Sequence, residues 1–195
     1  TAMVVGAAGD CSNRAQRKGT DFAELERISK GVAAEIDKIV CDQRLNLSYQ
    51  GDALVTYRVH YTPEDERPAL QKKIDEFQAK LDQTQDFGTR KLLGDAIGSL
   101  SRKLDLSEVD RTLFSSVVRL GDLEIVSIPG ELGSKLGIEL KAASPAACCI
   151  ICGYSNGYLS YILQPELFDD DPRCMGSRYR PQDVRAYVDA IKAQL

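Results

Sequence analysis

The stretch that decides the fold is FSSVVRLGDLEIVSIPGEL, residues 114–132. Two runs, 114–120 and 123–128, are rich in Val, Ile and Leu, which favours β-strands. They are separated by Gly121-Asp122, a pair typical of the tight turn between two antiparallel strands. The sequence therefore predicts a β-hairpin at this point of the chain.

An amphipathic helix is predicted from about residue 131, because Leu132, Leu136 and Leu140 recur at helical spacing. After it, residues 146–152 (AACCIIC) predict a strand buried on both faces. Its three cysteines are mixed with isoleucine and lack paired CxxC spacing, so we interpret them as core residues and not as metal ligands.

The rest of the chain predicts helices alternating with strands. The expected elements are a buried strand at 2–5, a helix capped by Thr20-Asp21 with apolar residues to Ile39, a strand over 45–61, helices with stripes from Leu70 to Leu81 and Leu93 to Leu104, and a final helix opened by Pro181. This alternation predicts an α/β fold, a mixed β-sheet flanked by helices. No linker is visible, so we expect a single domain over residues 1–195.

The composition excludes several classes of protein. The chain has 195 residues and a formal net charge of −4, with 43% hydrophobic and 28% charged residues. This balance supports a packed core, and its acidity argues against a nucleic-acid binder, which needs a basic surface. No apolar run approaches the roughly 20 residues that span a bilayer, so we expect no transmembrane segment.

The start of the chain is unusual, because it begins Thr1-Ala2-Met3 and enters an apolar run at once. We expect a chain cut from a larger catalytic domain, with the strand at 2–5 paired inside the sheet. In that case the missing N-terminal half of the same protein is the expected partner of this chain. The apolar surface that its absence leaves exposed would favour homo-oligomers.

Three polar clusters lie where predicted strands end, as ligand sites commonly do in sheet-and-helix folds. They are Gly9-Asp10-Cys11-Ser12, Pro129-Gly130-Glu131 and Asn156-x-Tyr158-x-x-Tyr161. Each also has a structural interpretation: a turn serine, a carboxylate at a helix start and a half-buried aromatic rim.

Taken together and in this order, the clusters resemble motifs of the neutral (alkaline, non-lysosomal) ceramidase family. Residues 6–13 (GAAGDCSN) resemble its Gly-Asp-Val-Ser-Pro-Asn stretch, and residues 119–132 resemble its RIGDL…VPGEF hairpin. Residues 156–161 (NGYLSY), with Glu166 shortly after, resemble its NxYxxY…EE loop. The resemblance extends from residue 3 to about 180.

The resemblance implies a zinc-dependent amide hydrolase acting on an amide or lipid-amide substrate. It makes Glu131 and Tyr161 two of the four zinc ligands and assigns Ser12 to the active site. The family's two histidine ligands lie upstream of the serine motif, so the only histidine, His60, matches neither of them. We therefore expect zinc in the full-length protein, but neither tight zinc binding nor activity in this chain alone. The resemblance also implies an exported protein.

The chain departs from the family pattern at two further positions. Asn13 replaces the proline after the serine, and Cys174 aligns with a tyrosine that helps to stabilise the transition state. A relative with another amide substrate therefore fits these residues at least as well as a ceramidase does. Two other hypotheses stay open: a non-catalytic binding domain that retains the hydrolase scaffold, and an N-terminal nucleophile at Thr1.

Overall fold

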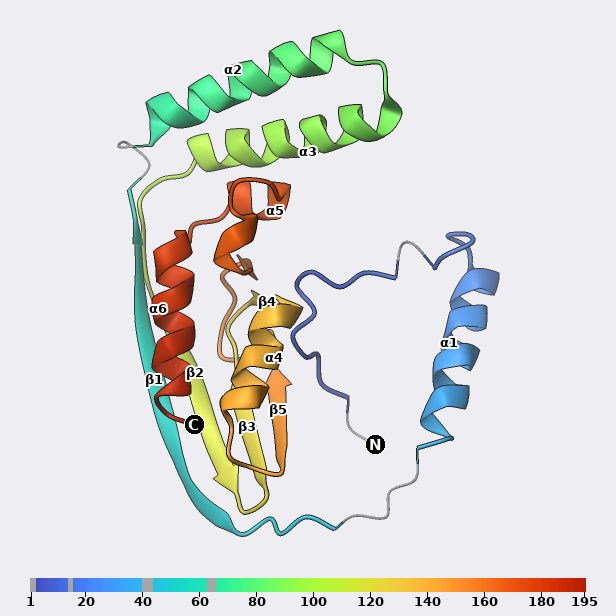
Figure 1. Ribbon diagram of the computed structural model, residues 1–195, viewed down its shortest axis with the longest axis vertical. Helices are drawn as coiled ribbons and strands as arrows, with labels where there is room; N and C mark the ends of the chain where they lie inside the picture. The colour runs from blue at the N-terminus through green and yellow to red at the C-terminus, as the bar shows by residue number, and fades with distance from the viewer. Residues whose placement is uncertain (1–2, 14–15, 40–43, 63–65) are drawn as a thin grey trace.

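The computed structural model describes residues 3–13, 16–39, 44–62 and 66–195. Its centre is a four-stranded mixed sheet in the order β1-β2-β3-β5 (Figure 1). The strands are β1 (Tyr49–Tyr61), β2 (Val109–Leu120), β3 (Leu123–Ser127) and β5 (Cys148–Cys152). β2 pairs antiparallel with both β1 and β3, whereas β5 is parallel to β3, so the predicted mixed sheet and α/β class are confirmed.

The predicted hairpin joins β2 to β3, with Leu120 directly opposite Leu123. Gly121 at the turn has a φ of 58°, which a residue with a side chain rarely adopts. The segment before β1 crosses this turn, and a Cβ at Gly121 would lie 2.3 Å from the carbonyl oxygen of Asn46. Both the backbone conformation and this close approach therefore require glycine.

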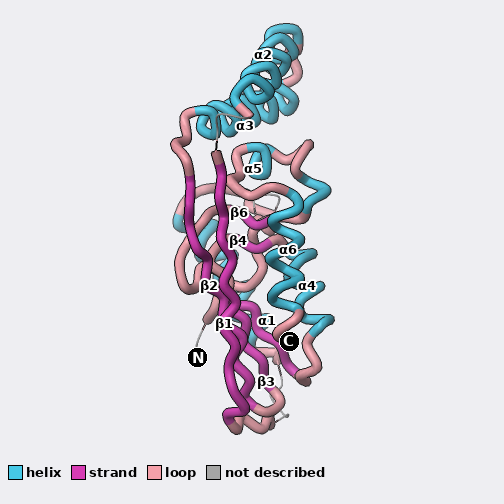
Figure 2. Tube along the Cα trace, turned by 90° about the vertical axis from the view of Figure 1, so that its left-hand side faces the viewer, coloured by secondary structure: helices cyan, strands magenta, loops and turns pink. Residues whose placement is uncertain are grey.

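Helices α4 (Ser134–Ala143) and α6 (Pro181–Lys192) cover one face of the sheet (Figures 1 and 2). The core lies between them and the inward-facing residues of the strands. Its fully buried members include Val117, Val126, Leu140, Val188 and Ile191. The final helix begins at Pro181, as the sequence predicts, because a proline needs no backbone N–H at the first helical position.

No helix of the described segments covers the opposite face of the sheet (Figure 2). Leu54 and Phe114 project there with 62% and 43% of their surface exposed. β5 forms the edge of the sheet, and Ile151 is its one buried residue. The prediction that residues 146–152 are buried on both faces is therefore wrong, because this edge strand is packed on one side.

Helices α2 (Arg67–Gln83) and α3 (Phe87–Leu104) form an antiparallel pair at one end of the sheet (Figure 1). Asp86 caps α3 by accepting a hydrogen bond from the backbone N–H of Thr89 at 2.7 Å. A small second core joins the pair to the short helix α5 (Pro172–Met175), and its buried residues are Leu70, Ala96, Leu100 and Met175. Both predicted helices are confirmed. The break between them, which the sequence indicates at Phe87-Gly88, lies instead at residues 84–86, because Asp86 caps α3 and Phe87 begins it.

Helix α1 (Phe22–Ile36) stands apart from the sheet (Figure 1). Its predicted N-cap is confirmed, since the Asp21 carboxylate accepts a hydrogen bond from the N–H of Glu24 at 2.9 Å. Its apolar stripe is uncovered: Phe22 is 88% exposed and Val32 is 55% exposed. The local sequence thus predicts the helix, but most of its apolar stripe is exposed and does not pack on the sheet.

Two predicted elements differ from the structure. Residues 3–5 form no strand and are exposed, and the backbone contact from Gly153 N–H to Val5 O at 2.7 Å lies beyond the end of β5. Residue 2 lies outside the described residues, as does Thr1. The prediction of a first strand paired inside the sheet is therefore wrong.

The helix predicted from about residue 131 begins at Ser134, because Glu131–Leu132 forms the short strand β4. β4 pairs in parallel with β6 (Tyr161–Ile162), which the 3-10 helix η1 (Pro165–Leu167) follows. Neighbouring segments supply the backbone partners that keep β4 extended: Gly9 N–H donates to Leu132 O at 2.8 Å.

Among the helices of the described residues, none combines the length and the apolar character that crossing a bilayer demands.

Candidate functional site

The candidate site is built on the β4–β6 pair, where Glu131 lies directly opposite Tyr161. Opposite residues on adjacent strands point to the same face, so these two side chains, 30 positions apart in sequence, are neighbours. The Glu131 N–H donates to Ser160 O at 3.0 Å. A Cβ at Gly130 would lie 2.6 Å from that same oxygen, so the glycine permits the close approach of the two strands.

Tyr158 holds the carboxylate of Glu131. Its hydroxyl donates a hydrogen bond to Glu131 Oε1 at 2.5 Å. The ring of Tyr154 is stacked against that of Tyr158, with 5.9 Å between the ring centroids. The bond to the Glu131 carboxylate, and then burial, raise the pKa of Tyr158 to about 12, so this phenol stays protonated and remains a donor at neutral pH.

The loop that carries these tyrosines has an unusual backbone. Tyr154, Asn156 and Ser160 have φ angles of 57°, 63° and 57°, in the left-handed region that residues other than glycine rarely enter. Asn156 is anchored by its Nδ2, which donates to Ser127 Oγ at the end of β3 at 2.7 Å. Such strained positions persist where surrounding contacts fix them, and they cluster at functional sites.

The segment around Gly9 lies against β4, where a Cβ at Gly9 would be 2.3 Å from the Glu131 carbonyl oxygen. Asp10 fixes the segment to α4, since its carboxylate accepts from Ser134 N at 2.7 Å and from Ser134 Oγ at 3.0 Å. Ser12 is exposed and lies three residues beyond Gly9, a span of at most about 10 Å. The structure thus carries Ser12 toward the end of the molecule that holds Glu131.

Arg173 of α5, which the sequence did not single out, connects the parts of this site. Its Nε and Nη2 donate to the Asp171 carboxylate, and its Nη1 donates to Gly9 O at 3.0 Å. Its guanidinium carbon lies 5.8 Å from the centre of the Tyr161 ring. The neighbouring Cys174 is buried, which raises the pKa of its thiol to about 12 and keeps it protonated. The local sequence carries no signal for the contact with Gly9, which is 164 positions away.

The described residues provide an incomplete set of metal ligands. They contain no cluster of three or more His, Cys, Asp and Glu side chains that could hold a metal ion. His60 lies on β1, half exposed, with Nδ1 3.7 Å from Glu108 Oε1. Glu131 and Tyr161 can offer two oxygen ligands on one face, which fits part of a zinc site and does not complete one.

The sheet, the helices on one of its faces and the β4–β6 pair together define an α/β protein with the neutral-ceramidase fold. The solved structure that carries this likeness is neutral ceramidase from Pseudomonas aeruginosa, with a TM-score of 0.51 and 16% sequence identity. The match covers 90% of this chain and 32% of that chain, so the present chain spans about a third of that enzyme's length. The resemblance to the neutral ceramidases is thereby confirmed at the level of the fold.

A second solved structure, a ceramidase complexed with C2, has a TM-score of 0.37 and 26% identity. The match covers 43% of this chain and 15% of that chain. No protein-family model and no curated protein sequence matches the chain.

The bond between Tyr158 and Glu131 can be tested by titration. In the unmodified chain Tyr158 is expected to titrate near pH 12, above the ordinary tyrosine value. In a Glu131→Gln variant its pKa is expected to fall toward that ordinary value, because the negative charge that disfavours the phenolate is gone. NMR of chains with ¹³Cζ-labelled tyrosine measures both values, with Tyr158→Phe assigning the signal. An unchanged pKa in Glu131→Gln contradicts the bond.

Proposed function

We propose that this chain is part of a zinc-dependent amide hydrolase of the neutral-ceramidase type. In this proposal Glu131 and Tyr161 are two of the four zinc ligands, and Ser12 belongs to the active site. The observation that carries it is the pairing of Glu131 with Tyr161 on one face of the β4–β6 pair, within a ceramidase fold. The motif resemblance that singles out these residues is independent of that geometry.

The residues of this chain have separate tasks in the proposed reaction. A bound zinc ion supplies a water of lowered pKa and polarises the amide carbonyl. Glu131 contributes an anionic oxygen, and the Tyr158 hydroxyl fixes its orientation from one side. Tyr161 has to lose its proton to act as a ligand, and the guanidinium carbon of Arg173 lies 5.8 Å from the centre of its ring.

The remaining ligands are proposed to come from a segment upstream of Thr1, as two histidines. The extent of the exposed surface supports this larger domain. The accessible surface is 12081 Å², whereas a compact protein of 21.5 kDa has roughly 9,200 Å². The uncovered sheet face and the exposed stripe of α1 contribute to the excess, and both are suited to packing against further polypeptide.

We propose an amide or lipid-amide as the substrate. Ceramide itself is one member of this class. The replacement of a family tyrosine by Cys174, whose thiol is buried and protonated, removes a phenol from the proposed transition-state contacts. A different acyl amide is therefore an equally suitable substrate, and a panel of acyl chains and amines is needed to identify it.

The proposal predicts a sharp difference between this chain alone and the complete protein. The isolated chain is expected to retain no stoichiometric zinc after dialysis and to hydrolyse no amide, because two oxygen ligands hold the ion weakly. The complete protein, with the upstream histidines, is expected to retain one zinc per chain and to hydrolyse an N-acyl amide. Elemental emission and an amide-hydrolysis screen measure the two properties.

Three results would contradict the proposal. Zinc held tightly by the isolated chain would require other ligands, for example among its cysteines. A complete protein without upstream histidines, or one that holds zinc but cleaves no amide in the panel, would favour a binding domain on the hydrolase scaffold.

A further inference from the structure

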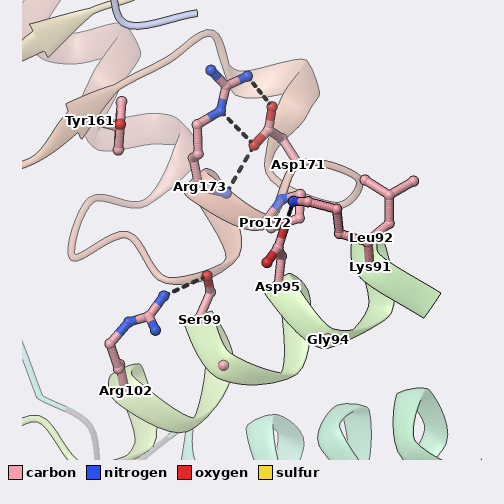
Figure 3. A pocket seen from close by; sticks show the side chains of 11 residues that line it. Lys91, Leu92, Gly94, Asp95, Ser99, Arg102, Tyr161, Asp171, Pro172 and Arg173 are labelled. Atoms are coloured by element: carbon pink, nitrogen blue, oxygen red, sulfur yellow. Dashed lines mark hydrogen bonds and ion pairs between the residues drawn. The ribbon is translucent and has the colours of Figure 1, made fainter. Parts of the chain in front are cut away.

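A cleft of about 570 Å³ lies between α3 and α5, beside the candidate site (Figure 3). Its floor is the face of α3 that carries Gly94, Gly98 and Ser99, and its opposite wall includes Arg173 and Tyr161. The volume lies within the range of small-molecule sites. The cleft therefore has room for a ligand larger than a simple ion.

The packing of α5 on α3 creates this cleft. At one end the two helices are in close contact, since a Cβ at Gly176 would lie 3.1 Å from Ser99 O. Toward the N-terminus of α3 they diverge, and a Cβ at Gly94 would meet nothing within 4 Å. The missing side chain at Gly94 thus leaves open space on this face of α3.

The charges in the cleft do not cancel. Of its three cations, Lys91 pairs with Asp95 at 2.9 Å and Arg173 pairs with Asp171 at 2.5 Å. The third, Arg102, forms an ion pair with no carboxylate of the described residues, and its Nη2 donates to the Ser99 hydroxyl at 3.1 Å. One positive charge in the cleft is therefore not neutralised.

Arg102 is also oriented for recognition. Its guanidinium lies against the bare backbone of Gly98, where an added Cβ would be 3.5 Å from Nη1. The bond to Ser99, a buried residue, holds the guanidinium at the cleft floor (Figure 3). The planar fork of an arginine can then bind two oxygens of a carboxylate or phosphate at once.

We propose that this cleft is a binding site for the anionic group of a small molecule, a carboxylate or a phosphate held by Arg102. Lys91 lies along the same face of α3 and has two further N–H donors beyond its bond to Asp95. The body of the ligand occupies the open space over Gly94, toward Tyr161. The site needs neither zinc nor hydrolysis, so it can be tested on this chain alone.

The probes are N-octanoylglycine, which carries a carboxylate, its uncharged methyl ester, and inorganic phosphate. Calorimetric titration of the chain is expected to show binding of N-octanoylglycine at least about tenfold tighter than of the ester, because charge-assisted hydrogen bonds are lost in the ester. Binding of phosphate in place of N-octanoylglycine would identify phosphate as the anion and would also support the site.

Three variants locate the binding. Arg102→Gln is expected to weaken it about tenfold or more. Gly94→Leu keeps every charge but fills the cleft, and since leucine favours a helix more than glycine does, binding is lost while the chain stays folded. Lys72→Gln removes a positive charge from the exposed face of α2 and is expected to leave affinity unchanged.

The proposal is overturned if wild-type chain binds neither anion, if the ester binds as tightly as the acid, or if Arg102→Gln and Lys72→Gln have equal effects.

Discussion

Replacing Glu131 with glutamine is expected to lower kcat/KM for amide hydrolysis by at least about 100-fold in the complete hydrolase proposed above. The amide has nearly the shape of the carboxylate and can still bond to Tyr158, but it lacks the negative charge of a zinc ligand. Zinc content, measured by elemental emission after dialysis, is expected to fall in parallel. The thermal unfolding temperature of the zinc-free protein is expected to change little.

Glu76→Gln is the matched control, because it makes the same chemical change on the exposed side of α2, where Glu76 pairs with Lys72 at 3.9 Å. It is expected to leave activity and zinc content unchanged. Full activity in Glu131→Gln would remove Glu131 from the proposed ligand set. The same conclusion would follow if Glu131→Gln kept its zinc and lost no more activity than Glu76→Gln does.

Truncation of Leu140 to alanine is expected to lower the free energy of unfolding by about 2–5 kcal/mol. Leu140 lies on the sheet side of α4 with 0% of its surface exposed, so the change removes buried methyl groups and leaves a cavity in the main core. Equilibrium unfolding in urea, followed by circular dichroism, measures the loss.

The same helix supplies the control. Ile138 is 68% exposed, and Ile138→Ala is expected to change the free energy of unfolding by no more than about 0.5 kcal/mol. Equal losses from the two variants would mean that α4 does not pack on the sheet through the face that carries Leu140.

The elements whose signals are local could be predicted from the sequence. The β2–β3 hairpin follows from two apolar runs around Gly121, whose φ of 58° suits glycine. The starts of α1 and α6 follow from Asp21 and Pro181, which act within their own first turn. In each case the physical cause is contained within a few neighbouring residues.

Predictions that depended on distant partners were less successful. The apolar run at 146–152 has the composition of a strand buried on both faces, but β5 lies at the sheet edge. Leu132 has the spacing of a helix residue, yet backbone bonds from Gly9 and to β6 hold it in a strand. The composition and periodicity of a segment carry no information about which other segments of the chain will lie beside it.

The candidate site also combines residues that the sequence indicates with contacts that it does not indicate. The motifs drew attention to Ser12, Glu131 and Tyr161, whose roles stay predictions. The bond from Tyr158 to Glu131 and the contact of Arg173 with the Gly9 segment join residues 27 and 164 positions apart. No local pattern encodes such contacts, because they depend on how β4, β6 and α5 are packed together.

By itself, the sequence determined the α/β class, the hairpin, the main helices and the set of residues that resemble a ceramidase motif. It could do so because hydrophobic periodicity, turn residues and helix caps act over one or two turns of chain. Only the tertiary structure decided that Glu131 faces Tyr161, that α4 and α6 cover one side of the sheet, and that Arg102 lines a cleft where it bonds to the Ser99 hydroxyl. These arrangements depend on contacts between segments that are distant in the sequence. Such segments meet only when the whole chain packs, so no local pattern specifies them.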